Sequence, residues 1–191
     1  MRITRIFTVL ATIAVVFATS GPAWAANGAR FGGSVYTGSP NLPLTVSLVT
    51  AGGGPSAFKT TTLVTYLAGD KTQAELNGLT QKFGAANVTS FVNVFDFVIS
   101  DSLALATKAG VTLPAADPSV TNGKSLAAAL YTQGNDDGHF NVEYMLDGLV
   151  THPIHVQVMK DIDTKYGAEA DANYHAVLTQ AMTDLKGVYG L

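Results

Sequence analysis

The residues best suited to bind a ligand lie in one stretch near the C-terminus. Between Thr151 and His175 the sequence reads THPIHVQVMKDIDTKYGAEADANYH, and it contains three of the four histidines of the chain. Neutral imidazole is the commonest metal ligand in proteins, and it also holds haem iron. Two interpretations therefore compete: a ligand site, or a helical hairpin that buries its imidazole rings for packing alone.

Two amphipathic helices are predicted on either side of Gly167. His155 lies on an apolar face of the first helix, and His175 lies beside an apolar face of the second. At a rise of about 1.5 Å per residue, His155 is roughly 18 Å from the turn, while His175 and Met159 are both roughly 12 Å from it. Because packed helices lie about 8–10 Å apart, His175 can approach either His155 or Met159 in a tight hairpin.

A His/His or His/Met pair in an apolar setting could hold the iron of haem b, or a transition metal such as copper. We therefore predict cofactor binding by His175, with His155 or Met159 as the second ligand, and metal binding by His175 and His155. The alternative is that no cofactor binds and His175 bonds to a buried carbonyl or to Tyr144. The chain has no cysteine, which excludes thiol catalysis, cysteine-ligated metals and covalent haem attachment.

The sequence predicts no catalytic residue. The NGKS stretch at 122–125 lacks the first glycine of a phosphate-binding loop, because Pro118 stands in its place. The DIDTKYG stretch begins like a calcium-binding loop, but Ala172 occupies the position of the bidentate glutamate. Catalysis with His175 as the base would need a carboxylate within hydrogen-bond reach. The sequence favours a binding protein over an enzyme.

The N-terminus has the pattern of an export signal. Arg2 and Arg5 precede an apolar run, and the small residues Ala23 and Ala25 stand at the cleavage positions. We predict a signal peptide at residues 1–25 and a periplasmic or secreted protein. After cleavage we expect no membrane span.

The charge of the chain excludes nucleic acid as a partner. The sequence has 11 basic and 14 acidic residues, a net charge of −3. Loss of the two signal-peptide arginines would lower the basic count to 9 and the net charge to −5. A nucleic-acid footprint needs clustered Lys and Arg, and the sequence has no such cluster. A small ligand or an envelope protein is the partner that we expect.

Hydrophobic periodicity predicts a mainly α fold. Residues 26–55 are rich in Gly, Pro, Ser and Thr and are predicted to form a flexible arm, although residues 42–52 fit a short strand or a helix equally well. From residue 56 onward the patterns are helical. The longest, NVTSFVNVFDFVISDSLALATKAG, is apolar on nearly all sides, which predicts a central buried helix. We expect one compact helical bundle over residues 56–191.

Two segments resemble pieces of truncated haemoglobins. The first, DGLVTHPIHVQVMKDIDTKYGAEADANYHAVLTQAM, is similar to the early distal-side helices of that family, and FVNVFDFVISDSLALATKAGVTLP is similar to its late helix. AGGGPSAF is similar to its glycine-pair turn. The segments come in inverted order, and no histidine precedes the late-helix segment, where the family keeps its proximal iron ligand. The resemblance implies globin-like packing, with any haem held by His175 or His155.

These observations predict an exported helical protein that binds haem or a transition metal, without catalysis, through the histidine hairpin. The alternative prediction is an envelope structural or protein-interaction domain with no cofactor. Its contact surface would be the acidic C-terminal half or the Gly/Pro-rich arm.

Overall fold

A computed structural model describes residues 40–191, and most of these residues are helical. The predicted signal peptide and residues 26–39 of the predicted arm lie outside the described residues. The helices, in chain order, are α2 (Leu42–Ala51), α3 (Thr60–Ala68), α4 (Thr72–Phe83), α5 (Ala85–Lys108), α6 (Gly123–Gly134), α7 (Val142–Leu149), α8 (His152–Tyr166) and α9 (Ala168–Tyr189). The short 3-10 helix η1 (Gly69–Lys71) joins α3 to α4, and the strands β1 (Asn135–Asp136) and β2 (His139–Phe140) lie between α6 and α7.

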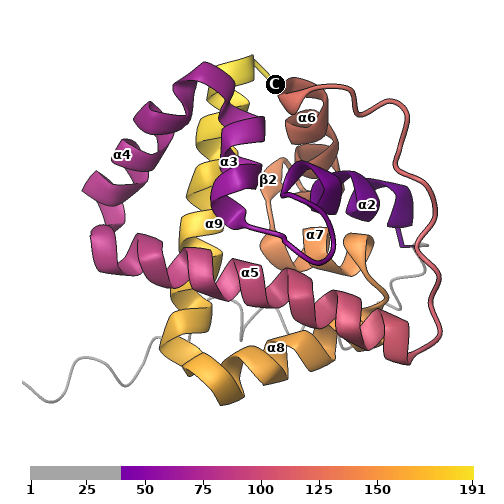
Figure 1. The fold of residues 1–191 in the computed structure, drawn as a ribbon. Helices are drawn as coiled ribbons and strands as arrows, with labels where there is room; N and C mark the ends of the chain where they lie inside the picture. The colour runs from indigo at the N-terminus through magenta and orange to yellow at the C-terminus, as the bar shows by residue number, and fades with distance from the viewer. Residues whose placement is uncertain (1–39) are drawn as a thin grey trace, which may run out of the picture. The chain divides into compact units, whose positions relative to one another are not determined.

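Helix α5 is buried along one side, and not on nearly all sides as its sequence predicts, because only 33% of its apolar 18-residue window is buried. It packs against α3, α4, α8 and α9, and Figure 1 shows it running across α9 and alongside α8. Its apolar residues recur at spacings of three and four, so one side of the helix is continuously covered by neighbours. Its buried residues are Val88, Phe91, Val94, Phe95, Val98, Ile99, Ser102 and Ala106.

By length and composition, α5 also meets the requirements of a membrane span, with a mean hydropathy of 1.4, and no other helix within residues 40–191 does so. The sequence pattern predicts no membrane span after the signal peptide. The core helix of a helical bundle and a membrane span share these properties, because both need a long apolar surface. In this structure the buried side of α5 packs against α3, α4, α8 and α9.

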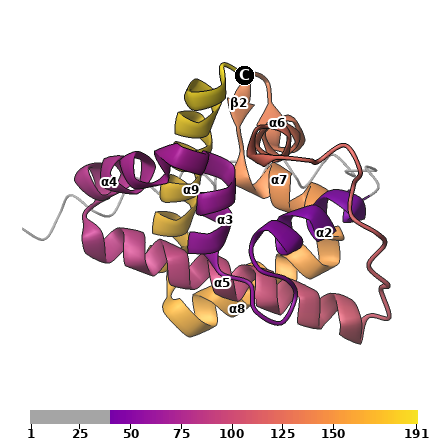
Figure 2. The ribbon, with the colours of Figure 1, turned by 45° about the horizontal axis from the view of Figure 1, so that its top comes forward.

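Helices α8 and α9 meet at Gly167, where the sequence predicts the turn. Gly167 has a φ of 86°, a conformation that residues with a Cβ atom rarely adopt. Its N–H donates a hydrogen bond to the carbonyl of Asp163, which ends α8. Figures 1 and 2 show α9 rising from the end of α8 across α5, so the two helices form an elbow rather than a tight antiparallel hairpin.

The helical domain begins at α2, earlier than the sequence predicts. The sequence predicts a flexible arm up to residue 55, but the side chains of Leu44 and Leu48 in α2 are each 1% exposed. Asn41 caps the helix, because its Oδ1 accepts a hydrogen bond from the N–H of Leu44. The local pattern fits strand and helix alike, and burial against α3, α6 and α7 decides between them. The compact bundle therefore begins before residue 56.

The chain reverses between α6 and α7 through the short strand pair. Asn135 pairs with Phe140, and both Asp137 and Gly138 between them have positive φ angles, the geometry of a tight hairpin turn. This reversal packs α7 against α6 and leaves α7 in contact with α8.

The start of α3 depends on a carboxylate from α5. Asp96 Oδ1 accepts hydrogen bonds from the backbone N–H of Thr60, at 2.5 Å, and from the hydroxyl of Thr60, at 2.7 Å. Lys59 occupies the N-cap position and its side chain makes no capping bond. Because the first N–H groups of a helix have no partner within the helix, they need an external acceptor. Here that acceptor comes from a residue 36 positions away.

Replacement of this distant cap should therefore destabilise the fold. We expect Asp96→Ala to lower the free energy of unfolding by about 1–2 kcal/mol, the cost of a lost helix cap, in urea denaturation followed by circular dichroism. Asp70→Ala is the control, because Asp70 is an exposed acid of η1, and it should change stability by less than about 0.5 kcal/mol. Equal effects of the two substitutions would contradict the assignment of Asp96 as the cap.

Candidate functional site

Two carboxylates of α7 hold the ring of His155 at both of its nitrogens. His155, in the first turn of α8, is only 4% exposed. Its Nδ1 lies 2.5 Å from Asp147 Oδ1, and its Nε2 lies 2.8 Å from Glu143 Oε2. Glu143 and Asp147 are four residues apart and therefore lie on one face of α7. The two acids and the ring form a buried ionic contact between α7 and α8.

Glu143 also reaches His175, which lies on α9. Its Oε1 is 3.4 Å from His175 Nε2, and the Oδ1 of Asp171, one turn earlier on α9, is 3.6 Å from the same nitrogen. The two histidines that the sequence predicts as ligands therefore approach one carboxylate from two helices. We call the following residues the histidine–carboxylate cluster: Glu143, Asp147, His155, Asp171 and His175.

Aromatic packing fixes the position of α9 beside the cluster. Tyr174 is fully buried, and its ring centroid lies 6.1 Å from that of Phe91 and 5.8 Å from that of Phe95, both on α5. Such ring pairs add to the burial of apolar area. Because Tyr174 is fixed against α5, the next residue, His175, is directed toward α7.

The charge of His155 is set by its two acidic partners. Burial by itself lowers the pKa of His155, but the hydrogen bond to Asp147 and the negative charges of Asp147 and Glu143 outweigh it and raise this pKa to about 9. Burial likewise opposes ionisation of Glu143, yet the close positive charge of His155 holds the pKa of Glu143 below its usual range. At neutral pH the site therefore contains an imidazolium between two carboxylates.

In the second half of the cluster, Asp171 and His175, burial disfavours the charged form of each side chain. Burial raises the pKa of Asp171 to about 7, and the negative charges of Asp163 and Glu143 add to this effect. Burial lowers the pKa of His175, so its ring is neutral at neutral pH. His175 and Asp171 thus form a buried pair without a positive charge of its own.

Several polar atoms of this region are buried and lack an aligned hydrogen-bond partner. They are His155 Nε2, His175 Nε2, Asp171 Oδ1 and the hydroxyl of Tyr174. The Glu143 oxygen lies close to His155 Nε2, so the contact between them is a close ion pair without good hydrogen-bond direction. Buried polar atoms nearly always have partners, and an exception calls for an explanation such as a bound ion or water.

The cluster as it stands is not a finished metal site. Among residues 40–191, no group of three or more histidine and acidic side chains is arranged to hold a metal ion. The contact of 2.8 Å between His155 Nε2 and Glu143 is too short for an ion between the two atoms, because bonds of about 2.0–2.2 Å at tetrahedral angles separate the donors by about 3.3 Å. The separations of 3.4 and 3.6 Å around His175 Nε2 are close to that value.

Met159, the other predicted partner of His175, is half-buried and packs against the apolar core. The position expected for it opposite His175 assumed a tight hairpin, whereas the elbow at Gly167 brings α7 into that place. The acidic partners of both histidines are not among the residues that the sequence predicts. The sequence does contain a signal for these acidic partners. Asp171 precedes His175 by one helical turn, and Glu143 precedes Asp147 by the same spacing, so each pair lies on one helix face.

The comparisons with known proteins found no relationship. No family model, no curated protein and no solved structure matches this chain. The fold and the cluster together define a helical bundle with a buried histidine–carboxylate site. The resemblance to truncated haemoglobins stays a prediction.

The charge state of His155 predicts how stability changes with pH. Its pKa of about 9 in the folded protein lies above the ordinary value of 6.5, so the folded state binds this proton more tightly than the unfolded state. The resulting stabilisation is fully present below pH 6.5 and is lost as the pH rises through about 9. We expect a decrease on the order of 3 kcal/mol, measured by urea unfolding of the metal-free protein at intervals above pH 7.

His155→Gln should flatten this part of the pH profile. His152→Gln is the matched control, because His152 is exposed at the start of the same helix, and it should leave the slope unchanged. Identical slopes for the two variants would contradict the ionic contact of His155 with Glu143 and Asp147.

Proposed function

We propose that this protein is an exported helical binding protein that holds a divalent transition-metal ion at the histidine–carboxylate cluster. One observation carries the proposal. His155 Nε2, His175 Nε2 and Asp171 Oδ1 are buried without aligned hydrogen-bond partners, and both ring nitrogens lie near the carboxylate of Glu143.

The charges of the cluster favour a cation. The carboxylates of Glu143 and Asp147 bring two negative charges and His155 one positive charge, and Asp171, with its pKa of about 7, adds a partial negative charge at neutral pH. Burial of uncompensated charge is costly, and the raised pKa of Asp171 is one consequence of that cost. A divalent cation would offset the excess negative charge and displace the proton of His155, since a metal ligand must be neutral imidazole.

The position of Asp147 supports His155 as a ligand. A metal-binding histidine usually donates the N–H of its other ring nitrogen to a carboxylate, which fixes the orientation of the ring. Asp147 lies 2.5 Å from Nδ1 of His155, so Nε2 would be the nitrogen that faces the ion. His175 and Asp171 would supply further donor atoms, and Glu143 would do so once its Oε2 moved away from His155 Nε2, because their 2.8 Å contact is too short for an ion between them.

The donor set favours an ion over haem. Two imidazoles with carboxylate oxygens and no thiolate suit Zn²⁺, and imidazole also suits copper, nickel and iron. Haem would need an open axial position on a ring nitrogen above a broad apolar surface. Here the Nε2 atoms of both histidines face carboxylates, which bind an ion more readily than a porphyrin.

A role in binding is favoured over catalysis. The cluster residues line neither the apolar hollow between α2 and α5 nor the polar hollow beside Lys165. The side chains of His155, Asp147 and Asp171 are at most 5% exposed, which leaves a substrate little access to them. We therefore propose an ion held inside the bundle for carriage, storage or structural support.

The export signal gives a direct test of location. When the full chain is expressed in a bacterial host, the protein recovered from the periplasm or the medium should begin at Ala26, as measured by intact mass spectrometry. Ala25→Leu should block this cleavage, because the cleavage position requires a small residue. Full-length protein retained in the cytoplasm would contradict export.

Zinc binding tests the site itself. Calorimetric titration of the metal-free protein with Zn²⁺ should give one site per chain. His175→Gln and Asp171→Asn should each weaken binding at least about tenfold, the lower end of the effect seen when ligands lose support.

His152→Gln and His139→Gln are matched controls, because both histidines are exposed and lie outside the cluster. They should leave the zinc affinity unchanged, and circular dichroism should confirm that all four variants are folded. If zinc does not bind, or if the control variants lose it equally, the metal proposal is wrong. The alternative, an envelope structural or interaction domain with no cofactor, would then be favoured.

A further inference from the structure

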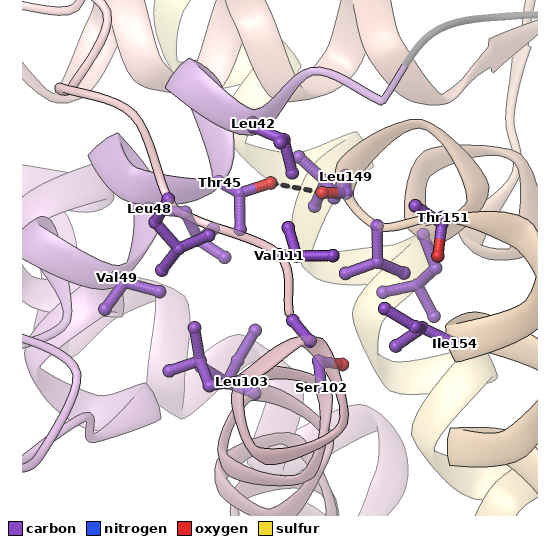
Figure 3. A pocket seen from close by; sticks show the side chains of 15 residues that line it. Leu42, Thr45, Leu48, Val49, Ser102, Leu103, Val111, Leu149, Thr151 and Ile154 are labelled. Carbon is purple, nitrogen blue, oxygen red and sulfur yellow. Dashed lines mark hydrogen bonds between the residues drawn. The ribbon is translucent and has the colours of Figure 1, made fainter. Parts of the chain in front are cut away.

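The polar hollow beside Lys165 has room for a small molecule, whereas the apolar hollow between α2 and α5 does not. The apolar hollow, shown in Figure 3, has a free volume of about 20 Å³, which is enough for about one water molecule. The polar hollow has a free volume of about 310 Å³. This value lies at the lower end of the range of roughly 300–1,000 Å³ that is typical of small-molecule sites.

Three segments that are far apart in the chain form the polar hollow. The loop from α2 to α3 provides one side, a face of α5 the second and the last turn of α8 the third. The residues that α5 contributes recur at spacings of three and four, so they lie on one face of that helix. Among the residues that line the hollow are Phe58, Asn93, Asp96, Phe97, Lys165 and Tyr166.

Lys165 brings a positive charge to the polar hollow. Its Nζ lies 4.0 Å from the centroid of the Phe97 ring and 5.1 Å from that of the Tyr166 ring. No carboxylate of residues 40–191 lies within 4.0 Å of this ammonium, although its charge acts on Asp101, which does not line the hollow. The rings attract the ammonium, and its N–H groups can still donate hydrogen bonds to an anion.

Asp96 brings a negative charge to the same hollow. Its Oδ1 accepts hydrogen bonds from the backbone N–H and the hydroxyl of Thr60. A carboxylate has about four lone-pair sites, so Asp96 can accept from a further donor while it caps α3. No cationic side chain of the described part of the chain lies within 4.0 Å of it. The hollow therefore contains two opposite charges that do not contact each other.

Aromatic rings form the apolar part of the polar hollow. The rings of Phe97 and Tyr166 pack edge to face, with their centroids 5.6 Å apart, and Phe58 lines the hollow from the loop between α2 and α3. Tyr166 is 36% exposed, so part of its ring is open to an occupant. Because aromatic rings attract one another in such arrangements, this part of the hollow favours a ligand that carries a ring.

We propose that the polar hollow binds a free amino acid with an aromatic side chain. The α-carboxylate would pair with the ammonium of Lys165 and the α-ammonium with the carboxylate of Asp96, through charge-assisted hydrogen bonds. The side chain would pack against the aromatic rings of the hollow. A ligand with only one charge would leave Lys165 or Asp96 without a counterpart. The site shares no residue with the histidine–carboxylate cluster, so it does not depend on the proposed metal site.

Titration of the metal-free protein with phenylalanine, followed by the chemical shifts of the backbone amides, tests the proposal. Metal-free protein is used because amino acids also bind metal ions. Phenylalanine should bind at one site, with the largest shifts at residues that line the polar hollow.

Three analogues of phenylalanine test each part of the proposed contact. Phenylpropionate lacks the ammonium, phenylethylamine lacks the carboxylate, and alanine lacks the ring. Each should bind at least about tenfold more weakly, because it loses a charge-assisted hydrogen bond or the burial of an aromatic ring. The analogue without the ammonium tests the role of Asp96 without disturbing the cap of α3. Failure of phenylalanine to bind, or equal binding of any analogue, would overturn the proposal.

Two pairs of variants place the binding in the polar hollow. Lys165→Met should weaken phenylalanine binding at least about tenfold, whereas Lys160→Met, at an exposed lysine of the same helix outside the hollow, should leave it unchanged. Tyr166→Leu should weaken binding at least about threefold. Its matched control is Tyr66→Leu, because both tyrosines are 36% exposed and Tyr66 does not line the hollow.

Circular dichroism should show that the four variants are folded, since each replaces an exposed side chain. Equal phenylalanine affinity in the two members of either pair would place the ligand outside the polar hollow and contradict the assignment.

Discussion

The burial of one imidazolium between two carboxylates is the interaction on which the arrangement of α7, α8 and α9 depends. His155 contacts Asp147 and Glu143 in a region where the ring is 4% exposed. Removal of one member of a buried ion pair typically costs about 3–5 kcal/mol, because a charge is left without compensation. A shift of α7 against α8 would separate His155 from its carboxylates and leave a buried charge without compensation. The contact therefore restricts the two helices to one relative position.

Helix α7 transmits this restriction to the rest of the bundle. Glu143 extends the polar contact to His175 on α9, while Leu146 and Leu149, on another side of the same short helix, line the apolar hollow. Most of its residues are buried, although it is only eight residues long. A helix covered on several sides has little freedom to rotate, because rotation would exchange polar and apolar surroundings. Helix α7 therefore separates the histidine–carboxylate cluster from the apolar hollow.

The core determines where α9 presents His175. Tyr174 packs on Phe91 and Phe95 of α5, and this aromatic contact sets the rotation of α9 about its axis. The fully buried Tyr174 is thus a structural neighbour of the site. Burial of its hydroxyl, together with the charges of Glu143 and Asp171, raises the pKa of Tyr174 well above the usual value. Of these two consecutive residues, Tyr174 positions α9 by packing and His175 makes the polar contact with Glu143. The same long helix α5 supplies Phe91 and Phe95, on which Tyr174 packs, and Ser102 and Ala106, which line the apolar hollow.

Local sequence patterns determined the helical class of the fold and the turn at Gly167, because periodicity and glycine positions act within one or two turns. Tertiary structure alone decided three other matters. It made residues 42–51 a buried helix, it opened the α8–α9 pair into an elbow, and it brought Glu143 of α7 close to both His155 and His175. Each depends on contacts between segments far apart in the chain, and no local pattern encodes such contacts.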